Sequence, residues 1–123
     1  MPQTIIEHSF PINKEKLSEL FLVLNQNIAK NEGNFDISQC KTRSIFCENF
    51  LVADGAAQEE FMHITIKILN SRTTEIKKNL AENIFKIVAD FLKRNKFTQS
   101  QIALSLDVRE MEKEIYQKIV ITT

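Results

Sequence analysis

Proline at position 2 is the residue whose type and place could do the most chemistry in this sequence. If Met1 is removed, Pro2 becomes the amino terminus and carries a secondary amine, which no internal proline has. A free α-amine has a pKa near ~7.8, and apolar surroundings or nearby cations lower that pKa toward the range that suits a general base. Pro2 therefore predicts proton transfer by an amine, although a proline merely tolerated before a strand would give the same pattern.

Three cations stand at positions that suit an anionic ligand. Lys41 and Arg43 lie two residues apart, so on an extended strand they share one face, most often a solvated or interface face. Arg72 comes just before the second expected helix, where the helix dipole disfavours a cation unless an anion is bound beside it. The three residues are compatible with carboxylate binding.

Histidines and cysteines do not form a metal-site pattern. His8 and His63 are far from each other and from Cys40 and Cys47 in the sequence, so we expect no metal. The two cysteines fall in one extended segment, about 23 Å apart at ~3.3 Å per residue, so we expect them to be reduced. No GxGxxG, Walker A, HExxH or GxSxG pattern occurs, and we expect no cofactor.

Two strand–helix–strand units, offset by about 60 residues, must position these groups. The expected elements, in order, are a strand at 4–10, a helix capped by Asn13, a strand at about 40–50, a strand at 62–68, a helix capped by Ser71 or Thr73, and a strand at 102–109. Equivalent apolar positions of the two units are Ile6 and Ile66, Leu20 and Leu80, Leu24 and Ile84, and Ile28 and Val88.

These units predict an α+β fold in which duplicated β-α-β units form a four-stranded sheet with two helices on one face. Each helical crossover favours parallel pairing of its two strands. We expect a single domain over 1–123, with repeats at roughly 2–52 and 61–110 and a tail at 111–123 that either docks on a neighbouring subunit or covers its own domain. The uncovered sheet face favours oligomerisation.

Composition excludes several classes of protein. Sixteen Lys and Arg balance sixteen Asp and Glu among 123 residues, which lacks the charge of a general nucleic-acid binder or a polybasic membrane module. No run of eighteen apolar residues and no secretory signal occurs, so we expect a cytoplasmic protein.

A family resemblance adds to these patterns. Its features are Met1-Pro2 opening a strand, the duplicated unit, and three segments: VADG at 52–55, FMHITIKI at 61–68 and SRTTE at 71–75. Together they resemble the 5-carboxymethyl-2-hydroxymuconate isomerase family of the tautomerase superfamily. The resemblance implies a homotrimer with sheets facing inward, helices outside, and active sites at subunit boundaries around the terminal proline.

The same resemblance implies roles for individual residues. Pro2 falls on the catalytic base, and Arg72 and Arg43 fall on substrate-binding arginines. Lys41 stands where close relatives carry arginine, so it keeps the charge but loses the bidentate fork for a carboxylate. Phe50 falls on a bulky aromatic position and would supply an apolar wall that lowers the pKa of the proline.

We therefore predict a cofactor-independent isomerase that shifts a double bond in an unsaturated 2-hydroxy or 2-oxo acid from aromatic catabolism. The substrate would be a small dicarboxylic or tricarboxylic acid, and Pro2 would carry its proton. The alternative is a non-catalytic trimeric domain for ligand binding or assembly, with a vestigial site and a retained Met1.

Overall fold

The computed structural model describes residues 2–123. Its elements alternate as the duplicated units require, and short 3-10 turns follow the first helix and the last strand. In chain order they are β1 (Gln3–His8), α1 (Lys14–Lys30), η1 (Ile37–Gln39), β2 (Lys41–Phe46), β3 (Glu60–Leu69), α2 (Thr74–Asn95), β4 (Ile102–Met111) and η2 (Lys113–Ile115).

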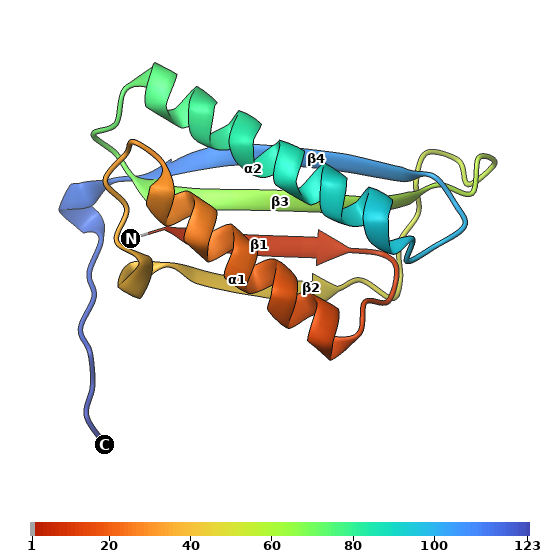
Figure 1. Ribbon diagram of the computed structural model, residues 1–123, viewed down its shortest axis with the longest axis horizontal. Coiled ribbons are helices and arrows are strands. Elements are labelled where there is room, and N and C mark those ends of the chain that lie inside the picture. The colour runs from red at the N-terminus through yellow and green to blue at the C-terminus, as the bar shows by residue number, and fades with distance from the viewer. Residues whose placement is uncertain (1) are drawn as a thin grey trace.

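The four strands form one mixed sheet in the order β2-β1-β3-β4. Each helical crossover joins parallel neighbours, β1 with β2 and β3 with β4, which confirms the expected pairing within each unit. The two units meet along β1 and β3, which run antiparallel and so relate the units by a pseudo-two-fold axis. The fold is thus α+β with duplicated β-α-β units, as predicted (Figure 1).

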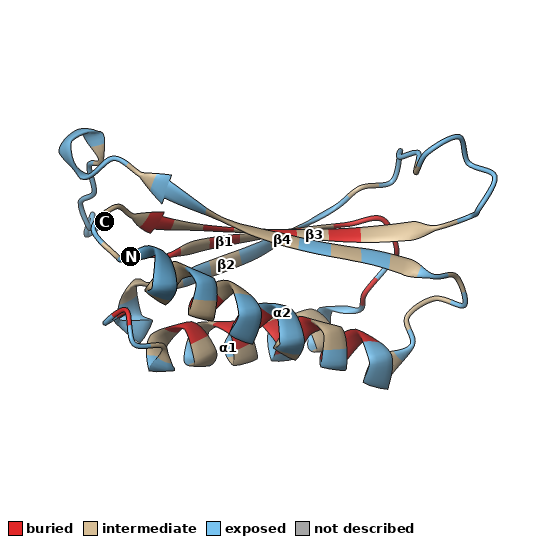
Figure 2. Ribbon diagram, turned by 90° about the horizontal axis from the view of Figure 1, so that it is seen from above, coloured by how far each residue is buried: buried red, intermediate tan, exposed pale blue. Residues whose placement is uncertain are grey.

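Both helices lie on the same face of the sheet, and the core is the layer between them (Figure 2). The equivalent apolar positions of the two units confirm the repeat, because all of their side chains are fully buried there: Ile6, Leu20, Leu24, Ile28, Ile66, Leu80, Ile84 and Val88. Residues of alternate parity on β1 and β3 point to the opposite face, which no element of the described chain covers; this is called the open face below.

Local signals fix the ends of the helices. The Asn13 side chain accepts a hydrogen bond from Lys16 N at 2.8 Å, and the Thr73 hydroxyl accepts one from Ile76 N at 3.2 Å. Both caps were predicted, Thr73 as one of two candidates. Helix α2 ends at Asn95 and is capped by Lys96, whose left-handed backbone donates its N–H to Leu92 O.

The strand boundaries were predicted less well. The first strand was expected at 4–10 and the second at about 40–50, whereas β1 ends at His8 and β2 ends at Phe46. The pairing between these two strands ends with Cys47 N donating to His8 O, and Ser9 continues only toward β3, where its N–H donates to Phe61 O. Among the described residues, no helix is long and apolar enough to cross a membrane.

Candidate functional site

Sheet topology brings the predicted base and all three predicted cations toward one end of the molecule. Because β1 is parallel to β2 and antiparallel to β3, the starts of β1 and β2 lie beside the ends of β3 and β4. Gln3 pairs with Lys41 on one side and with Lys67 on the other. We call this the proximal end; the tail that follows β4 also leaves from it (Figure 1).

Pro2 is buried at the proximal end, immediately before β1. Its carbonyl oxygen accepts a hydrogen bond from Lys41 N at 3.1 Å, so the start of β2 holds Pro2 in place. Met1 lies outside the described residues, and so does the expectation that it is removed. The carbonyl of Pro2 is therefore anchored to the start of β2.

Lys41 and Arg43 share the open face of β2, as their spacing predicted. Thr42, between them, points the other way and donates its hydroxyl to the side-chain oxygen of Asn25 on α1 at 2.6 Å. Arg43 Nη1 donates to Gln3 Oε1 at 2.8 Å, and both cations are exposed. Gln3 thus orients Arg43 toward the proximal end.

A cleft of about 740 Å³ opens beside Gln3 and Lys41, the first residues of β1 and β2, and Pro2 itself does not line it. Gln3 and Lys41 form one wall, and the other walls come from η1 and the tail: Ser38, Gln39, Tyr116, Gln117, Lys118, Ile119 and Val120. Lys118 Nζ donates to Gln39 Oε1 across it. The cleft therefore combines two lysines, several neutral hydrogen-bonding groups and an apolar strip, which suits a small acid with both charged and hydrocarbon parts.

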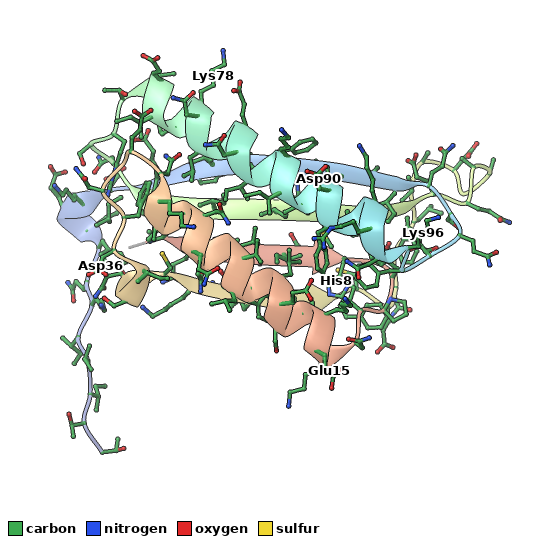
Figure 3. The ribbon with its side chains drawn as sticks, viewed as in Figure 1. His8, Glu15, Asp36, Lys78, Asp90 and Lys96 are labelled. Carbon is green, nitrogen blue, oxygen red and sulfur yellow. The ribbon has the colours of Figure 1, made fainter. Side chains whose placement is uncertain are left out.

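The short turn η1 positions the floor of this cleft. Asp36 caps it by accepting a hydrogen bond from Ser38 N at 3.0 Å, and Figure 3 shows Asp36 at the proximal end, on the same side as the tail. That backbone hydrogen bond, together with one from the Ser38 side chain, lowers the pKa of the Asp36 carboxyl below its ordinary value of 3.8. Asp36 is therefore an anionic cap at neutral pH.

Arg72 lies at the same end but faces other partners. Its Nε donates to Gly33 O at 3.1 Å and its Nη1 to Leu69 O at 3.3 Å, while its guanidinium lies over the ring of Phe35 at 4.5 Å. It borders a separate hollow of about 310 Å³ between the α1–β2 and β3–α2 connections. Within one chain Arg72 is a clamp between these connections, and its substrate-binding role remains a prediction.

Phe50 is at the opposite end, which we call the distal end. Its ring packs against Phe61 with centroids 5.9 Å apart, and Phe61 O accepts a hydrogen bond from Ser9 N. Ser9 lies seven residues after Pro2, so at ~3.3 Å per strand residue Phe50 is roughly 23 Å from Pro2. Phe50 can reach a Pro2 only in another copy of the chain.

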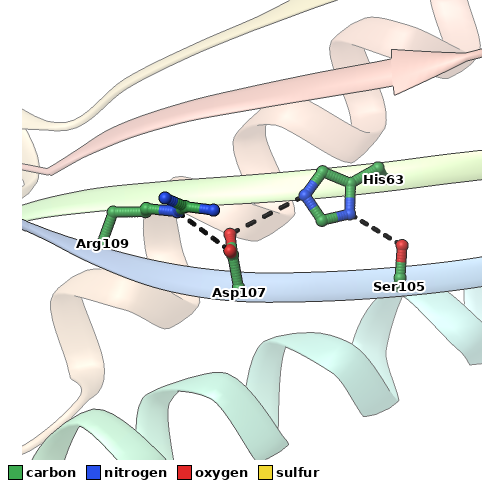
Figure 4. Close-up of polar contacts among 4 residues, drawn as sticks. All are labelled: His63, Ser105, Asp107 and Arg109. Atoms are coloured by element: carbon green, nitrogen blue, oxygen red, sulfur yellow. Dashed lines mark hydrogen bonds and ion pairs between the residues drawn. The ribbon is translucent and has the colours of Figure 1, made fainter.

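His63 belongs to a polar network on the open face (Figure 4). Its Nδ1 lies 2.7 Å from Ser105 Oγ and its Nε2 lies 3.7 Å from Asp107 Oδ1, while Arg109 Nε donates to Asp107 Oδ2 at 3.0 Å. These are neighbours on paired strands of a flat surface, and the 3.7 Å contact is longer than a hydrogen bond. The network fits the structural or interface role expected for His63.

Of the residues that line the cleft, the sequence predicted only Lys41 as a site residue, and Gln3 and Lys118 are among those it missed. Gln3 has no local signal, because its contact with Arg43 depends on the pairing of strands 40 residues apart. Lys118 lies in the tail, and the sequence did not decide whether the tail covers its own domain or docks on a neighbouring subunit. Only the assembled sheet shows that Gln3 and Lys118 lie near Pro2.

Similar proteins have the same architecture. A crystal structure of a 5-carboxymethyl-2-hydroxymuconate isomerase from Deinococcus radiodurans R1 superposes with a TM-score of 0.84 at 21% identity, over 96% of this chain and 88% of that one. A fused 4-OT, described as a wild-type asymmetric trimer, gives a TM-score of 0.73 at 10% identity, over 94% and 91% of the two chains. The fold is that of the tautomerase superfamily.

Sequence comparison narrows this class to one family. The profile of the 5-carboxymethyl-2-hydroxymuconate isomerase family matches residues 2–120, so the chain belongs to that family and is an isomerase. The 5-carboxymethyl-2-hydroxymuconate Delta-isomerase of Escherichia coli is 27% identical over 113 residues, which cover 90% of this chain and 87% of that protein. The predicted family and enzyme class are confirmed.

Proposed function

We propose that this isomerase moves a carbon–carbon double bond in an unsaturated 2-hydroxy or 2-oxo acid with two or three carboxylates. The substrate resembles 5-carboxymethyl-2-hydroxymuconate, the compound in the name of the E. coli relative. The observation that carries the proposal is a 740 Å³ cleft with lysines on two walls, lined by Gln3, which follows the buried Pro2, and by Lys41, whose N–H donates to the Pro2 carbonyl. We assign the reaction to the catabolism of aromatic acids in the cytoplasm.

The chemistry needs one group that carries a proton between two atoms of the substrate. Pro2, freed of Met1, takes the proton of the 2-hydroxyl group as a neutral secondary amine. The oxygen becomes a ketone, the electrons shift through the diene, and the distal carbon receives the proton from the prolinium. The double bond then lies in conjugation with the ketone, Pro2 is neutral again, and every proton and electron pair is accounted for.

The cations hold the substrate and favour the charge that develops on it. Lys41 and Lys118 face the cleft and pair with carboxylates, and Arg43, oriented by Gln3, adds a planar fork at its edge. Positive charge near the enol oxygen stabilises that oxygen as it loses its proton. The same charge lowers the pKa of the Pro2 amine, so more of it is in the basic form at neutral pH.

A homotrimer would complete the site. Phe50 is roughly 23 Å from Pro2 in its own chain and needs a second copy to become an apolar wall of the cleft. The open face of the sheet, which no described element covers, offers a surface for such contacts, and the fused 4-OT relative is described as a trimer. Arg72 contributes to substrate binding in this assembly through the N–H groups that its backbone partners leave free.

The test is a Pro2→Ala variant with Pro11→Ala as its matched control. Pro11 is an exposed proline in the turn after β1 and has no amine in any processed form of the chain. We expect Pro2→Ala to lower kcat by about 10²- to 10⁴-fold, the usual contribution of a general acid–base group, and Pro11→Ala to leave kcat unchanged. Far-UV circular dichroism confirms that both variants are folded.

The mass of the intact chain completes this test. The proposal expects a mass that lacks one methionine, since a retained Met1 turns the Pro2 nitrogen into a peptide nitrogen with no basic lone pair. Near-full activity of Pro2→Ala refutes the mechanism. A chain that retains Met1 and turns over no muconate substrate would instead favour a non-catalytic trimeric binding domain.

A further inference from the structure

A polar groove of about 590 Å³ lies between helices α1 and α2, which run side by side in opposite directions (Figures 1 and 2). We call it the interhelical groove. It shares no lining residue with the cleft beside the starts of β1 and β2. Four of its residues are half-buried and form a floor, and five are exposed and form a rim: Asn27, Asn31, Asn79 and Ile87 in the floor, and Lys30, Glu32, Asn83, Lys86 and Asp90 in the rim.

Asparagines stand at groove positions where helix stability disfavours them. The asparagine side chain competes for backbone hydrogen bonds, so this residue is a poor helix former, yet Asn27 lies inside α1 and Asn79 and Asn83 lie inside α2. Asn79 and Asn83 are four residues apart and therefore share one face of α2. Their role must come from contacts in the groove, because the helix itself gains nothing from them.

The amides of the groove use only part of their hydrogen-bonding capacity. Asn79 Nδ2 donates to Glu32 Oε1 at 2.7 Å, whereas Asn83 Nδ2 reaches Asn31 Oδ1 only at 3.4 Å. Within the described chain, the side-chain oxygens of Asn79 and Asn83 have no donor. The Nδ2 atom of Asn31 is buried and has no acceptor there. A buried donor without a partner is unfavourable, so a ligand that supplies an acceptor for it is stabilised.

The rim carries two cations and two anions, and none of the four forms an ion pair with any described residue: Lys30, Glu32, Lys86 and Asp90. Lys86 and Asp90 are one turn apart on α2, so they share a face and yet do not pair with each other. Asn79, the partner of Glu32, lies about 16 Å before Asp90 along α2, at 1.5 Å per residue, so the two carboxylates are too far apart to share a metal ion. A cation and an anion held apart on one helix face suit a ligand that carries both charges.

We propose that the interhelical groove binds a small zwitterion, a free α-amino acid whose side chain ends in a carboxamide. Lys86 pairs with the carboxylate and Asp90 with the ammonium group. One turn earlier on α2, the ligand carboxamide donates to Asn83 Oδ1 and accepts from Asn31 Nδ2, in place of the long bond between these two residues. Ile87 in the floor offers an apolar contact for the methylene groups of the ligand.

The first test titrates L-glutamine into the ¹⁵N-labelled protein and follows the backbone and asparagine side-chain N–H signals by NMR. We expect saturable shifts at the groove residues, with a dissociation constant of about 1 mM, as for a small polar ligand in an open site. Two analogues test the need for both charges: 4-carbamoylbutanoate lacks the ammonium group, and 4-aminobutanamide lacks the carboxylate. Each should bind at least about threefold more weakly. Shifts that do not saturate by about 50 mM, saturable shifts only outside the groove, or equal binding of either analogue overturns the proposal.

The second test removes one charge at a time. Lys86→Met and Asp90→Asn alter the groove, and Lys78→Met and Glu82→Gln make the same kinds of change at exposed positions of α2 outside it; Figure 3 shows Lys78 near the start of α2, pointing away from α1. We expect the two groove variants to bind L-glutamine about threefold to fivefold more weakly, and the two controls to bind it as the wild type does, with unchanged far-UV circular dichroism in all four. Wild-type affinity in either groove variant, or an equal loss in its control, refutes the site. The measurement reads binding and not turnover, so it decides the proposal whatever the outcome for Pro2→Ala.

Discussion

The clamp formed by Arg72 predicts a large loss of stability when its side chain is removed. Arg72→Ala deletes two hydrogen bonds from a charged donor to Gly33 O and Leu69 O and the contact with the Phe35 ring. Because Arg72 is partly exposed, each hydrogen bond contributes about 1.5 kcal/mol, the low end for a charged group, and the ring contact about 0.5–1 kcal/mol. Freeing the ordered side chain offsets about 1 kcal/mol. The free energy of unfolding should fall by about 2.5–3 kcal/mol.

Urea unfolding followed by circular dichroism measures this change, at one protein concentration so that assembly does not shift the midpoint. For a chain of this size the melting temperature should fall by about 6–12 °C. Arg94→Ala is the matched control, since Arg94 is exposed and only its distant contact with Phe91, at 5.9 Å, is lost. It should cost less than about 1 kcal/mol. Equal losses in the two variants, or a loss below about 1 kcal/mol for Arg72→Ala, would show that the clamp does not stabilise the fold.

Two further predictions concern the connection between α1 and β2. In Gly33→Ala the new Cβ would lie only 2.8 Å from Phe35 Cζ and 3.2 Å from Ile76 Cγ2, so unfolding in urea should show a loss of about 1–3 kcal/mol; an unchanged midpoint contradicts this packing. In Asp36→Asn the pH dependence should change, because the lowered pKa of Asp36 gives a stabilisation that is complete above the ordinary value of 3.8 and is lost as the pH falls through the lower, folded value. The melting temperature of the wild type should therefore fall relative to that of the variant between about pH 5 and about pH 2, and a constant difference would refute this account.

Local signals in the sequence predicted the elements better than their arrangement. Apolar spacing and caps such as Asn13 act within a few residues, and the structure confirms them. The repeat also predicted the core, because one buried position in each unit implies its equivalent. The central pairing of β1 with β3 was not predicted, since it joins strands about 60 residues apart that have no turn between them.

In the candidate site, too, local spacing was predicted from the sequence and long-range contacts were not. The two-residue spacing of Lys41 and Arg43 places them on one strand face by geometry alone. Gln3 and Lys118 enter the site only through strand register and the path of the tail, which a single sequence does not specify. The place of Phe50 depends on a second copy of the chain, so neither the sequence nor one folded chain can bring it to Pro2.

The pseudo-two-fold axis between the units makes the proximal and distal ends of the sheet alike in construction. The two ends differ in the chemistry that they can supply. The start of β3 at the distal end is the counterpart of the start of β1, yet the chain runs into it without a break from residues 47–59. In the proposed mechanism only the β1 end supplies an amine. The second strand–helix–strand unit therefore repeats the elements that surround the proposed base but cannot perform the reaction. A circular permutation that opens the chain before Glu60 would place a terminal amine at the start of β3 and remove it from the start of β1.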